Sequence, residues 1–269
     1  MKNKHEVNLY LELLKKAILF EIWLEHEIYS PANLPIPPKL YEFIQAHKLQ
    51  LVHVKKPNPE ARREGLDWPV IAHSMIGRLR LNQLHEAMKT VIKDKIKGDF
   101  IETGVWRGGS CIFMRGFLKA YNIKNRNVWV ADSFKGLPAP NVEKYPKDAG
   151  DTLYTSDYLR VSLEEVKQNF NKYDLLDDQV KFLEGWFKDT LPFAPINNIA
   201  IARLDGDLYE STMDSLTSLY HKVSLGGYII IDDYTLPTCQ PAVEDFRKQH
   251  NITEPLIRID HYGAYWRKR

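Results

Sequence analysis

GDFIETGVWRGGS, residues Gly98 to Ser110, runs from an apolar segment through an acidic residue into a turn interrupted by glycines. Phe100 and Ile101 favour a strand, and the segment CIFMRGFLKAY after Ser110 has the apolar spacing of a helix. A strand that opens into a helix through a glycine turn lets backbone N–H groups approach a small ligand closely. Glycine also serves purely steric purposes in such turns, so this stretch alone leaves ligand binding and simple chain reversal equally open.

A second acidic residue, Asp132, makes ligand binding the better interpretation. In VWVADSFKG it follows an apolar strand that covers Val128 to Ala131. The carboxyl ends of parallel strands meet at one edge of a sheet, where a carboxylate can accept hydrogen bonds from both ribose hydroxyls of a nucleoside. The two stretches together predict a nucleoside-bearing cofactor at the ends of the first two strands.

Composition indicates a globular chain with an ordinary core. The 269 residues are 44% hydrophobic, and 37 Lys and Arg against 35 Asp and Glu leave a net charge of +2. This balance favours no polyanionic partner such as a nucleic acid. Cys111 and Cys239 lack metal-type spacing, and Cys111 falls on the apolar stripe of a predicted helix. The opening segment MKNKHEVNLYLELLKKAILFEIW carries too many charges for a signal peptide or a membrane span. We therefore expect a reduced, cytoplasmic protein without membrane insertion.

The first 95 residues are predicted to form a helical cap. Apolar residues at helical spacing indicate one helix from Val7 to about Ile28 and another from about Met75 to Ile92. The prolines between Pro31 and Pro69 predict an irregular chain with one short helix. The cap could close the mouth of the sheet as a lid or serve as a packing or dimer arm, and residues 96–269 would form the core domain.

Strands and helices alternate from the second strand to the end of the chain. The long polar loop from Lys135 to Arg160 is of the kind that contacts substrate at the carboxyl edge of a sheet. Ser162 begins the next helix as an N-cap, with Glu165 three residues later. Further strands are predicted at Val180–Gly185, Ile199–Leu204 and Gly226–Ile231, and in the closing segments PLIRID and GAYWRKR. This alternation predicts the α/β class, with a mostly parallel sheet and helices on both faces.

Three aspartates follow two of these strands. Asp205 ends one strand, and Asp232 and Asp233 end another, so all three must converge on the edge that carries Asp132. Gathered carboxylates repel one another unless a cation or a proton intervenes, and oxygen ligands at strand ends suit Mg²⁺. Helix capping would explain one such acid better than three. For the nearby Asp207, a capping or orienting role is as open as chemistry.

Several separated motifs, in a fixed order, resemble those of the class I S-adenosylmethionine-dependent methyltransferases. The motifs are NLYLELLKKAI, AHSMIGRLRLNQL, GDFIETGVWRGGSCIFMRG, VWVADSFKGLP, YDLLDDQVKFLEGWFKDTLP, RLDGDLYESTMDSL, SLGGYIIIDDY and GAYWR. They cover nearly the whole chain. More narrowly, they resemble the macrocin-type sugar O-methyltransferases, which methylate deoxysugar hydroxyls on macrolides and aminocoumarins.

The resemblance implies a Rossmann-like, seven-stranded sheet whose last strand is antiparallel, a helical N-terminal lid and a homodimer. It implies S-adenosylmethionine and Mg²⁺ as cofactors, with Asp205, Asp232 and Asp233 as the metal ligands that present two vicinal sugar oxygens. Asp132 would hold the ribose. The candidate cofactor-binding residues are Ser74, Met75, Glu102, Thr103, Gly104, Val105, Trp106, Asp132, Ser133, Phe134, Gly136, Ser162, Gly185, Trp186 and Asp189.

The implied chemistry activates a sugar hydroxyl, which is a poor nucleophile when neutral. Mg²⁺ would lower the pKa of the hydroxyl while Asp205 removes its proton, with Asp207 as a second candidate base. Methyl transfer is then an in-line displacement at the sulfonium methyl, for which the protein supplies alignment and excludes water. The acceptor would be a small molecule or a glycan; the loop from Lys135 to Arg160 matches no macrolide-binding pattern that would name it.

Other functions remain open from the sequence. A catechol or another small diol would also place two adjacent oxygens on a metal, although the long polar loop favours a sugar. A cofactor-binding protein without catalysis would have no need of the complete set of acids. An RNA methyltransferase would require a basic face, which the charge balance does not indicate.

Overall fold

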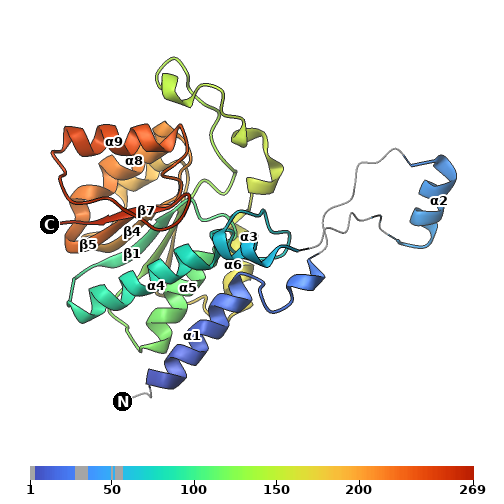
Figure 1. Ribbon diagram of the computed structural model, residues 1–269, viewed down its shortest axis with the longest axis horizontal. Coiled ribbons are helices and arrows are strands. Elements are labelled where there is room, and N and C mark those ends of the chain that lie inside the picture. Colours follow the sequence, from blue (N-terminus) through green and yellow to red (C-terminus); the bar gives the residue numbers. More distant parts are fainter. Residues whose placement is uncertain (1–3, 28–35, 50, 52–56) are drawn as a thin grey trace.

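The computed structural model describes residues 4–27, 36–49, 51 and 57–269, and within them seven strands form one sheet. The strands are β1 (Asp99–Thr103), β2 (Val128–Asp132), β3 (Val180–Glu184), β4 (Ile199–Leu204), β5 (Val223–Ile231), β6 (Ile257–Arg258) and β7 (Ala264–Arg267). Their order is β3-β2-β1-β4-β5-β7-β6. β1 to β5 pair in parallel, whereas β7 is antiparallel to both β5 and β6. The predicted α/β class with a mostly parallel, seven-stranded sheet is confirmed (Figure 1).

Helices cover both faces of the sheet, as predicted (Figure 1). They are α1 (Lys4–Ile18), α2 (Pro38–Ala46), α3 (Pro59–Glu64), α4 (Gly77–Lys93), α5 (Gly109–Ala120), α6 (Leu163–Asn171), α7 (Phe187–Thr190), α8 (Tyr209–Leu219) and α9 (Cys239–Gln249). Successive strand residues point to opposite faces, so Phe100 packs with α1, α4, α5 and α6 while Ile101 packs with α8 and α9. Trp266 of β7 is fully buried.

The strands are aligned so that their carboxyl ends lie at the same level. The N–H of Gly104, just after β1, donates to the carbonyl of Ala131. In the same way the N–H of Asp205 donates to Thr103, and the N–H of Asp232 donates to Leu204. These contacts bring the segments after β1, β2, β4 and β5 to one edge. Open α/β sheets bind their ligands at this edge.

The N-terminal helices differ from the sequence-based prediction in two ways. α1 ends at Ile18, because Phe20 adopts a left-handed φ of 54° and the Ile18 carbonyl accepts the N–H of His73. Part of the predicted extension, including Ile28, lies outside the described residues. α3 forms within a segment predicted to hold a single short helix: Asn58 caps its first N–H groups and Gly65 ends it in the left-handed conformation.

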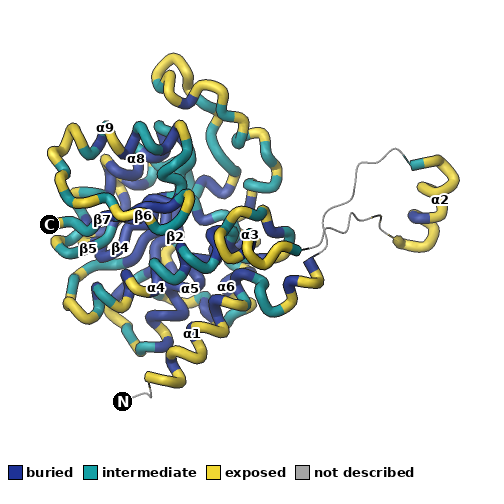
Figure 2. Tube along the Cα trace, in the orientation of Figure 1, coloured by how far each residue is buried: buried dark blue, intermediate teal, exposed yellow. Residues whose placement is uncertain are grey.

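α1 and α2 have different surroundings. α1 packs against α5, and its Leu11 and Ile18 are fully buried in the cluster that also covers the sheet. α2 stands away from the rest of the chain (Figure 1), and Ile44 is its single buried residue (Figure 2). α1 is therefore part of the helical layer of the core, whereas the described residues of α2 contribute little to it.

The long loop after β2 is held at its middle and at its C-terminal end. Asp148 is fully buried in the loop, and its carboxylate accepts the N–H groups of Tyr209 and Glu210 at the start of α8. Ser162 caps α6 by accepting the N–H of Glu165 at 3.2 Å, as predicted. The loop therefore has a defined path along the carboxyl edge of the sheet.

The structure also describes the two cysteines and the apolar character of the helices. Cys111 and Cys239 are both buried as free thiols in the described part of the chain. Among the helices formed by the described residues, none combines the length and the apolar character needed to cross a bilayer.

His85 on α4 predicts an acid-sensitive contribution to stability. It lies edge-on to Phe113 and Phe117 of α5, and burial, reinforced by the charge of Lys15, lowers its pKa to about 4. The unfolded chain therefore takes up this proton near pH 6.5, before the folded chain does. The contribution to stability is complete above pH 6.5 and is lost as the pH falls through 4.

We expect His85→Leu to reduce the loss of thermal stability between pH 7 and pH 5 by about 2–4 °C. Calorimetric unfolding at both pH values measures this difference. His221→Gln, at an exposed position, should leave the loss unchanged. If the His85→Leu chain loses as much stability as the unchanged chain, His85 does not control the acid response.

Candidate functional site

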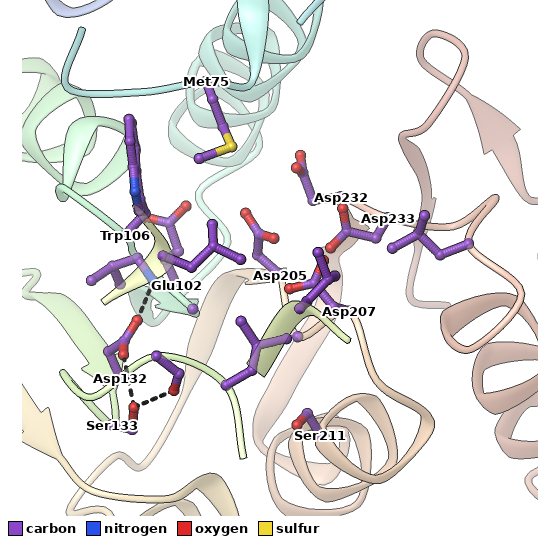
Figure 3. Close-up of a pocket in the computed structure, with 18 of the residues that line it drawn as sticks. Met75, Glu102, Trp106, Asp132, Ser133, Asp205, Asp207, Ser211, Asp232 and Asp233 are labelled. Carbon is purple, nitrogen blue, oxygen red and sulfur yellow. Dashed lines mark hydrogen bonds between the residues drawn. The ribbon is translucent and has the colours of Figure 1, made fainter. Parts of the chain in front are cut away.

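A cavity of about 660 Å³ opens at the carboxyl edge of the sheet (Figure 3). The segments that follow β1, β2, β4 and β5 form its floor, and Gly65 to Trp68 together with Ser74 to Ile76 form one wall. The loop after β2 contributes a second wall through Gly136 to Ala139. The cavity has the size of a site for a small molecule, and it lies where open α/β sheets bind their ligands.

The turn after β1 needs glycine because the next strand end touches it. Gly104 has a φ of 81°, and a Cβ atom there would lie 1.7 Å from the carbonyl oxygen of Asp205. The segments after β1 and β4 can therefore meet in the floor of the cavity. Trp106, Phe134 and Asp207 also have left-handed φ values of 46°, 54° and 55°. These three residues follow β1, β2 and β4, so the backbone is strained in the turns that form or support the cavity floor.

Asp132 links the turn after β1 to the turn after β2. Its Oδ2 accepts the N–H of Val105 and its Oδ1 accepts the N–H of Phe134, both at 2.8 Å. Burial raises the pKa of this carboxyl group, and the two backbone donors oppose that effect. Figure 3 shows Asp132 beside Ser133 below Trp106. Asp132 thus holds the shape of both turns and can offer its remaining lone pairs to a ligand.

Ten of the predicted cofactor-binding residues line the cavity, and five do not belong to its described lining. The lining residues are Ser74, Met75, Glu102, Gly104, Val105, Trp106, Asp132, Ser133, Gly136 and Trp186. Thr103 instead faces Ser215 of α8, and Ser162 caps α6. Asp189 is exposed on α7. Phe134 and Gly185 contact Asp132 through their backbone N–H groups, so they support the site without facing the cavity.

Asp205, Asp207 and Asp233 form a cluster in the cavity floor. Each offers an oxygen that lies within 4.8 Å of the others, and Figure 3 shows the three carboxylates side by side. Burial, followed by the charges of neighbouring aspartates, raises the pKa values of Asp207 and Asp233 well above the ordinary range. Oδ2 of Asp233 is buried without a hydrogen-bond partner among the described residues. A bound cation would relieve the repulsion among these three carboxylates.

Asp232, the third predicted metal ligand, also lines the cavity and is hydrogen-bonded to two arginines. Its Oδ2 accepts a hydrogen bond from Arg80 of α4, and its Oδ1 accepts one from Arg203 of β4. Both oxygens are therefore engaged by buried guanidinium groups. Asp207 lies close to Asp205 and Asp233, and the cavity lining contains all four aspartates.

Arg203 is a site residue that the sequence analysis did not identify. It is 1% exposed, and it forms ion pairs with Glu102, Asp205 and Asp232. Burial raises the pKa of Glu102 to about 7, against the opposing charge of Arg203. An arginine inside the otherwise apolar strand IAIARL was the available signal, because a buried cation requires anionic partners.

Aromatic side chains join the cavity walls above the turn after β1. Trp68 stacks on Tyr158 of the long loop with ring centroids 5.0 Å apart, and Tyr158 contacts Trp106 at 5.3 Å. The Tyr158 hydroxyl donates to the carbonyl of Pro69 at 2.6 Å, and the Trp106 indole donates to the carbonyl of Tyr158 at 3.0 Å. The segment before α4, the long loop and the turn after β1 therefore meet in one contact.

Comparison with known proteins identifies the family. The chain matches the macrocin O-methyltransferase (TylF) family over residues 7–268. The chain belongs to this family. Demethyldecarbamoylnovobiocin O-methyltransferase of Streptomyces niveus is 53% identical over 211 residues, 78% of this chain and 80% of that protein. Mycinamicin III 3''-O-methyltransferase of Micromonospora griseorubida is 44% identical over 265 residues, 97% of each.

The solved structure of the O-methyltransferase NovP confirms the fold of this macrocin O-methyltransferase family member. It superimposes with a TM-score of 0.85 at 45% identity, and the match covers 97% of this chain and 99% of NovP. The relatives named above are O-methyltransferases, so this chain is an O-methyltransferase. Its class I fold implies S-adenosylmethionine as the methyl donor.

Proposed function

We propose that this family member transfers the methyl group of S-adenosylmethionine to a sugar hydroxyl of a small glycosylated molecule, with the help of Mg²⁺. The observation that carries the proposal is the cluster of Asp205, Asp207 and Asp233 in the cavity that Asp132 and the turn after β1 also line. A methyl donor and a metal-bound acceptor could therefore occupy one cavity. Two relatives are named for the acceptors demethyldecarbamoylnovobiocin and mycinamicin III, which supports a small-molecule acceptor.

The proposed cofactor position follows from the lining residues. Asp132 would accept hydrogen bonds from the ribose hydroxyls through the lone pairs that Val105 and Phe134 leave free. Ser74 and Met75 would meet the methionine end, because they belong to the opposite wall of the cavity. The turn after β1 would pass beneath the donor. This assignment keeps the ribose and methionine ends on residues from different elements.

The acid cluster fits Mg²⁺ by its chemistry. It consists of carboxylate oxygens, which Mg²⁺ prefers, and it includes the unpartnered Oδ2 of Asp233. Asp205, Asp207 and Asp233 would hold the ion, which when bound would lower the pKa of an acceptor hydroxyl. Asp232, the ligand predicted from the sequence, would have to release Arg80 or Arg203 to take part.

We assign the proton transfer to Asp205, with Asp207 as the second candidate. Burial, with the charge of Asp232 next, raises the pKa of Asp205, so its carboxylate is a better proton acceptor than an exposed aspartate. Arg203 donates to Oδ2 of Asp205 at 2.9 Å and so fixes its orientation. Asp207 is a candidate because burial and neighbouring charges raise its pKa well above the ordinary range.

The remaining role of the protein is to exclude water and orient the two substrates. The contact of Trp68, Tyr158 and Trp106 spans the cavity wall, so we propose that this contact, rather than α1, covers the donor. The proposed cap, residues 1–95, would then act through the segment just before α4. We further propose that the protein works as a homodimer in the cytoplasm.

The first experiment is calorimetric titration of S-adenosylmethionine, S-adenosylhomocysteine and NAD, each with Mg²⁺ and with EDTA. We expect both adenosyl compounds to bind under either condition and NAD not to bind. Methylation assays with demethyldecarbamoylnovobiocin and mycinamicin III would follow, with turnover at least about a hundredfold lower in EDTA. The proposal fails if neither adenosyl compound binds, and its metal component fails if EDTA leaves turnover unchanged.

The assignment of Asp132 predicts a specific loss of cofactor affinity. Asp132→Ala should weaken S-adenosylmethionine binding by about ten- to a hundredfold, because hydrogen bonds to a charged acceptor are lost. Glu184→Ala is the matched control, since Glu184 pairs with Asp132 in register at the end of β3 but is exposed. Its affinity should stay within about twofold of the unchanged chain. Equal affinity in the Asp132 variant would remove this residue from the ribose site.

A further inference from the structure

Tyr262 lines the cavity at the opposite end of the row of strand ends from Asp132. It lies just before β7, which pairs antiparallel with β5, so its turn is at the same edge of the sheet as the carboxyl ends of the parallel strands. Neighbouring strands lie about 4.8 Å apart, so the ends of β2 and β7 are separated by roughly 19 Å. Asp205 and Asp233 follow β4 and β5, which lie between them. Asp132, the acid cluster and Tyr262 therefore follow one another across the cavity.

The turn between β6 and β7 holds Tyr262 in a defined position. The side chain of Asp260 is 3% exposed, and its Oδ1 accepts the N–H groups of Tyr262 at 2.9 Å and Gly263 at 2.7 Å. Its Oδ2 accepts Nε of Arg80 at 3.0 Å. The N–H of Ile259 donates to the carbonyl of Gly263 at 2.9 Å and closes the turn. The backbone that carries the Tyr262 ring is therefore fixed by its own hydrogen bonds, without a ligand.

Arg80 supports the Tyr262 ring from one side. The guanidinium carbon of Arg80 lies over the ring, 5.7 Å from its centroid, and Arg80 itself is 6% exposed. Nη2 of Arg80 donates to the carbonyl of Gly65 at 3.2 Å, so the wall that begins at Gly65 meets the Tyr262 turn through this arginine. Tyr262 is only partly buried and lines the cavity. Its ring is thus backed by a buried cation and offers its remaining surface to a ligand.

Two leucines add apolar surface to the cavity lining around Tyr262. Leu236 follows β5, and Leu66 comes from the wall before α4. Thr235, which precedes Leu236, donates its hydroxyl to the carbonyl of His261 at 3.2 Å, so the segment after β5 is tied to the Tyr262 turn. Carboxylates and apolar groups thus lie close together in this part of the cavity. Such a lining suits a ligand with hydroxyl groups along its edge and C–H groups on its face, as a sugar has.

We propose that Tyr262 is an acceptor-binding residue whose ring packs against the C–H face of the acceptor sugar. This role rests on the proposed function, which places the sugar hydroxyls at the acids that follow β4 and β5. A sugar held there has the donor on one side and Tyr262 on the other. Packing on the ring removes C–H surface of the sugar from water, and it fixes the orientation of the sugar towards the donor.

The test measures acceptor affinity without turnover. Demethyldecarbamoylnovobiocin and mycinamicin III are titrated calorimetrically into the full chain in the presence of S-adenosylhomocysteine and Mg²⁺. We expect Tyr262→Ala to bind each acceptor that the unchanged chain binds about tenfold more weakly, because the apolar contact is lost. The affinity for S-adenosylhomocysteine should stay within about twofold, since the Asp132 side of the cavity is unchanged. Equal acceptor affinity in Tyr262→Ala overturns the proposal.

Two further substitutions separate the ring from the hydroxyl and from the fold. Tyr262→Phe keeps the ring, so its acceptor affinity should lie within about threefold of the unchanged chain. A loss in Tyr262→Phe as large as in Tyr262→Ala would assign the contact to the hydroxyl and overturn the ring packing. If Tyr262→Ala does not fold, Tyr262→Leu takes its place, because leucine keeps apolar volume but not the flat ring. Acceptor binding by Tyr262→Leu equal to that of the unchanged chain then overturns the proposal.

His261 provides the matched control in the same turn. It is exposed and does not belong to the described lining of the cavity. His261→Ala should bind the acceptors within about twofold of the unchanged chain. A tenfold loss in His261→Ala would mean that the turn acts through the fold, and so would a parallel loss of acceptor and S-adenosylhomocysteine affinity in Tyr262→Ala. Either result overturns the specific role of Tyr262.

Failure of the proposed function gives a different result from failure of this role. If the unchanged chain binds S-adenosylhomocysteine but neither acceptor, the sugar acceptor is refuted and the role of Tyr262 is refuted with it. If the unchanged chain binds an acceptor and Tyr262→Ala binds it equally well, the proposed function stands and only the role of Tyr262 is refuted.

Discussion

Replacing Asp205 with asparagine should lower kcat by about a thousandfold to ten-thousandfold and leave the affinity for S-adenosylmethionine within about threefold. The residue is proposed both to hold the metal and to accept the proton, so one substitution removes two contributions to the reaction. The cofactor side should be spared, because Asp132 and the turn after β1 keep their own hydrogen bonds. Single-turnover kinetics and calorimetry on the same preparation separate the two effects.

The matched control for this prediction is Asp178→Asn. Asp178 is exposed just before β3, at the opposite edge of the sheet, and its substitution should leave kcat within about twofold. Asp207→Asn distinguishes the two candidate bases. A larger loss of kcat in Asp207→Asn than in Asp205→Asn would transfer the role of base to Asp207. A parallel loss of kcat and cofactor affinity in Asp205→Asn would mean that Asp205 supports the fold instead.

The sheet and the location of the site could be predicted because they depend on local patterns. β4 covers Ile199–Leu204 as predicted, and an apolar run bounded by polar residues is enough to locate such a strand. Once the strands are parallel, the residues that follow them must meet at one edge, and Asp132, Asp205 and Asp233 do so. Ser162 was also predictable as a cap, since its partner is three residues away.

The ion pairs of the site could not be predicted from these patterns. Arg80 and Asp232 are 152 positions apart, and nothing in either local sequence specifies the contact. The same holds for Trp68 and Tyr158, which meet through two irregular segments. Which acids remain available to a cation depends on which are already paired, and this requires the three-dimensional arrangement of the arginines.

The ends of α1 could not be predicted from local sequence, whereas the ends of α3 could. α1 ends at Ile18 because His73, distant in the sequence, donates to its carbonyl, although the apolar spacing continues to Ile22. Local periodicity does not contain that information. α3, by contrast, has readable signals in Asn58, Pro59 and Gly65, an N-cap, a first-turn proline and a left-handed C-terminal glycine. The sequence analysis does not predict α3, because the surrounding prolines indicate an irregular chain.

Removing the guanidinium group of Arg203 should have the largest effect on stability. Arg203→Met leaves Glu102, Asp205 and Asp232 without their shared guanidinium in a buried setting. We expect the free energy of unfolding at pH 7.5 to fall by about 3–5 kcal/mol, since breaking a buried pair leaves charge uncompensated. Urea unfolding monitored by circular dichroism measures this loss.

The pH dependence of this loss tests its electrostatic origin. The pKa of Glu102 is already raised to about 7 in the presence of Arg203, and without the cation it should rise further. For an acid whose pKa is higher in the folded chain, stability is complete below the unfolded pKa near 4.5 and is lost as the pH rises through the folded pKa. The deficit of Arg203→Met should therefore be smallest near pH 5 and largest above pH 7.

Arg115→Met separates this effect from the loss of a buried arginine in general. Arg115 is 5% exposed on α5, but its ion-pair partner Asp177 has a partly exposed side chain. Water can solvate Asp177 when the arginine is removed, so we expect a loss of about 1 kcal/mol. Equal losses in the two variants, or a deficit in Arg203→Met that does not change between pH 5 and pH 8, would contradict the electrostatic account. A pH-dependent deficit confined to Arg203→Met would support the electrostatic account, in which one arginine stabilises three buried carboxylates.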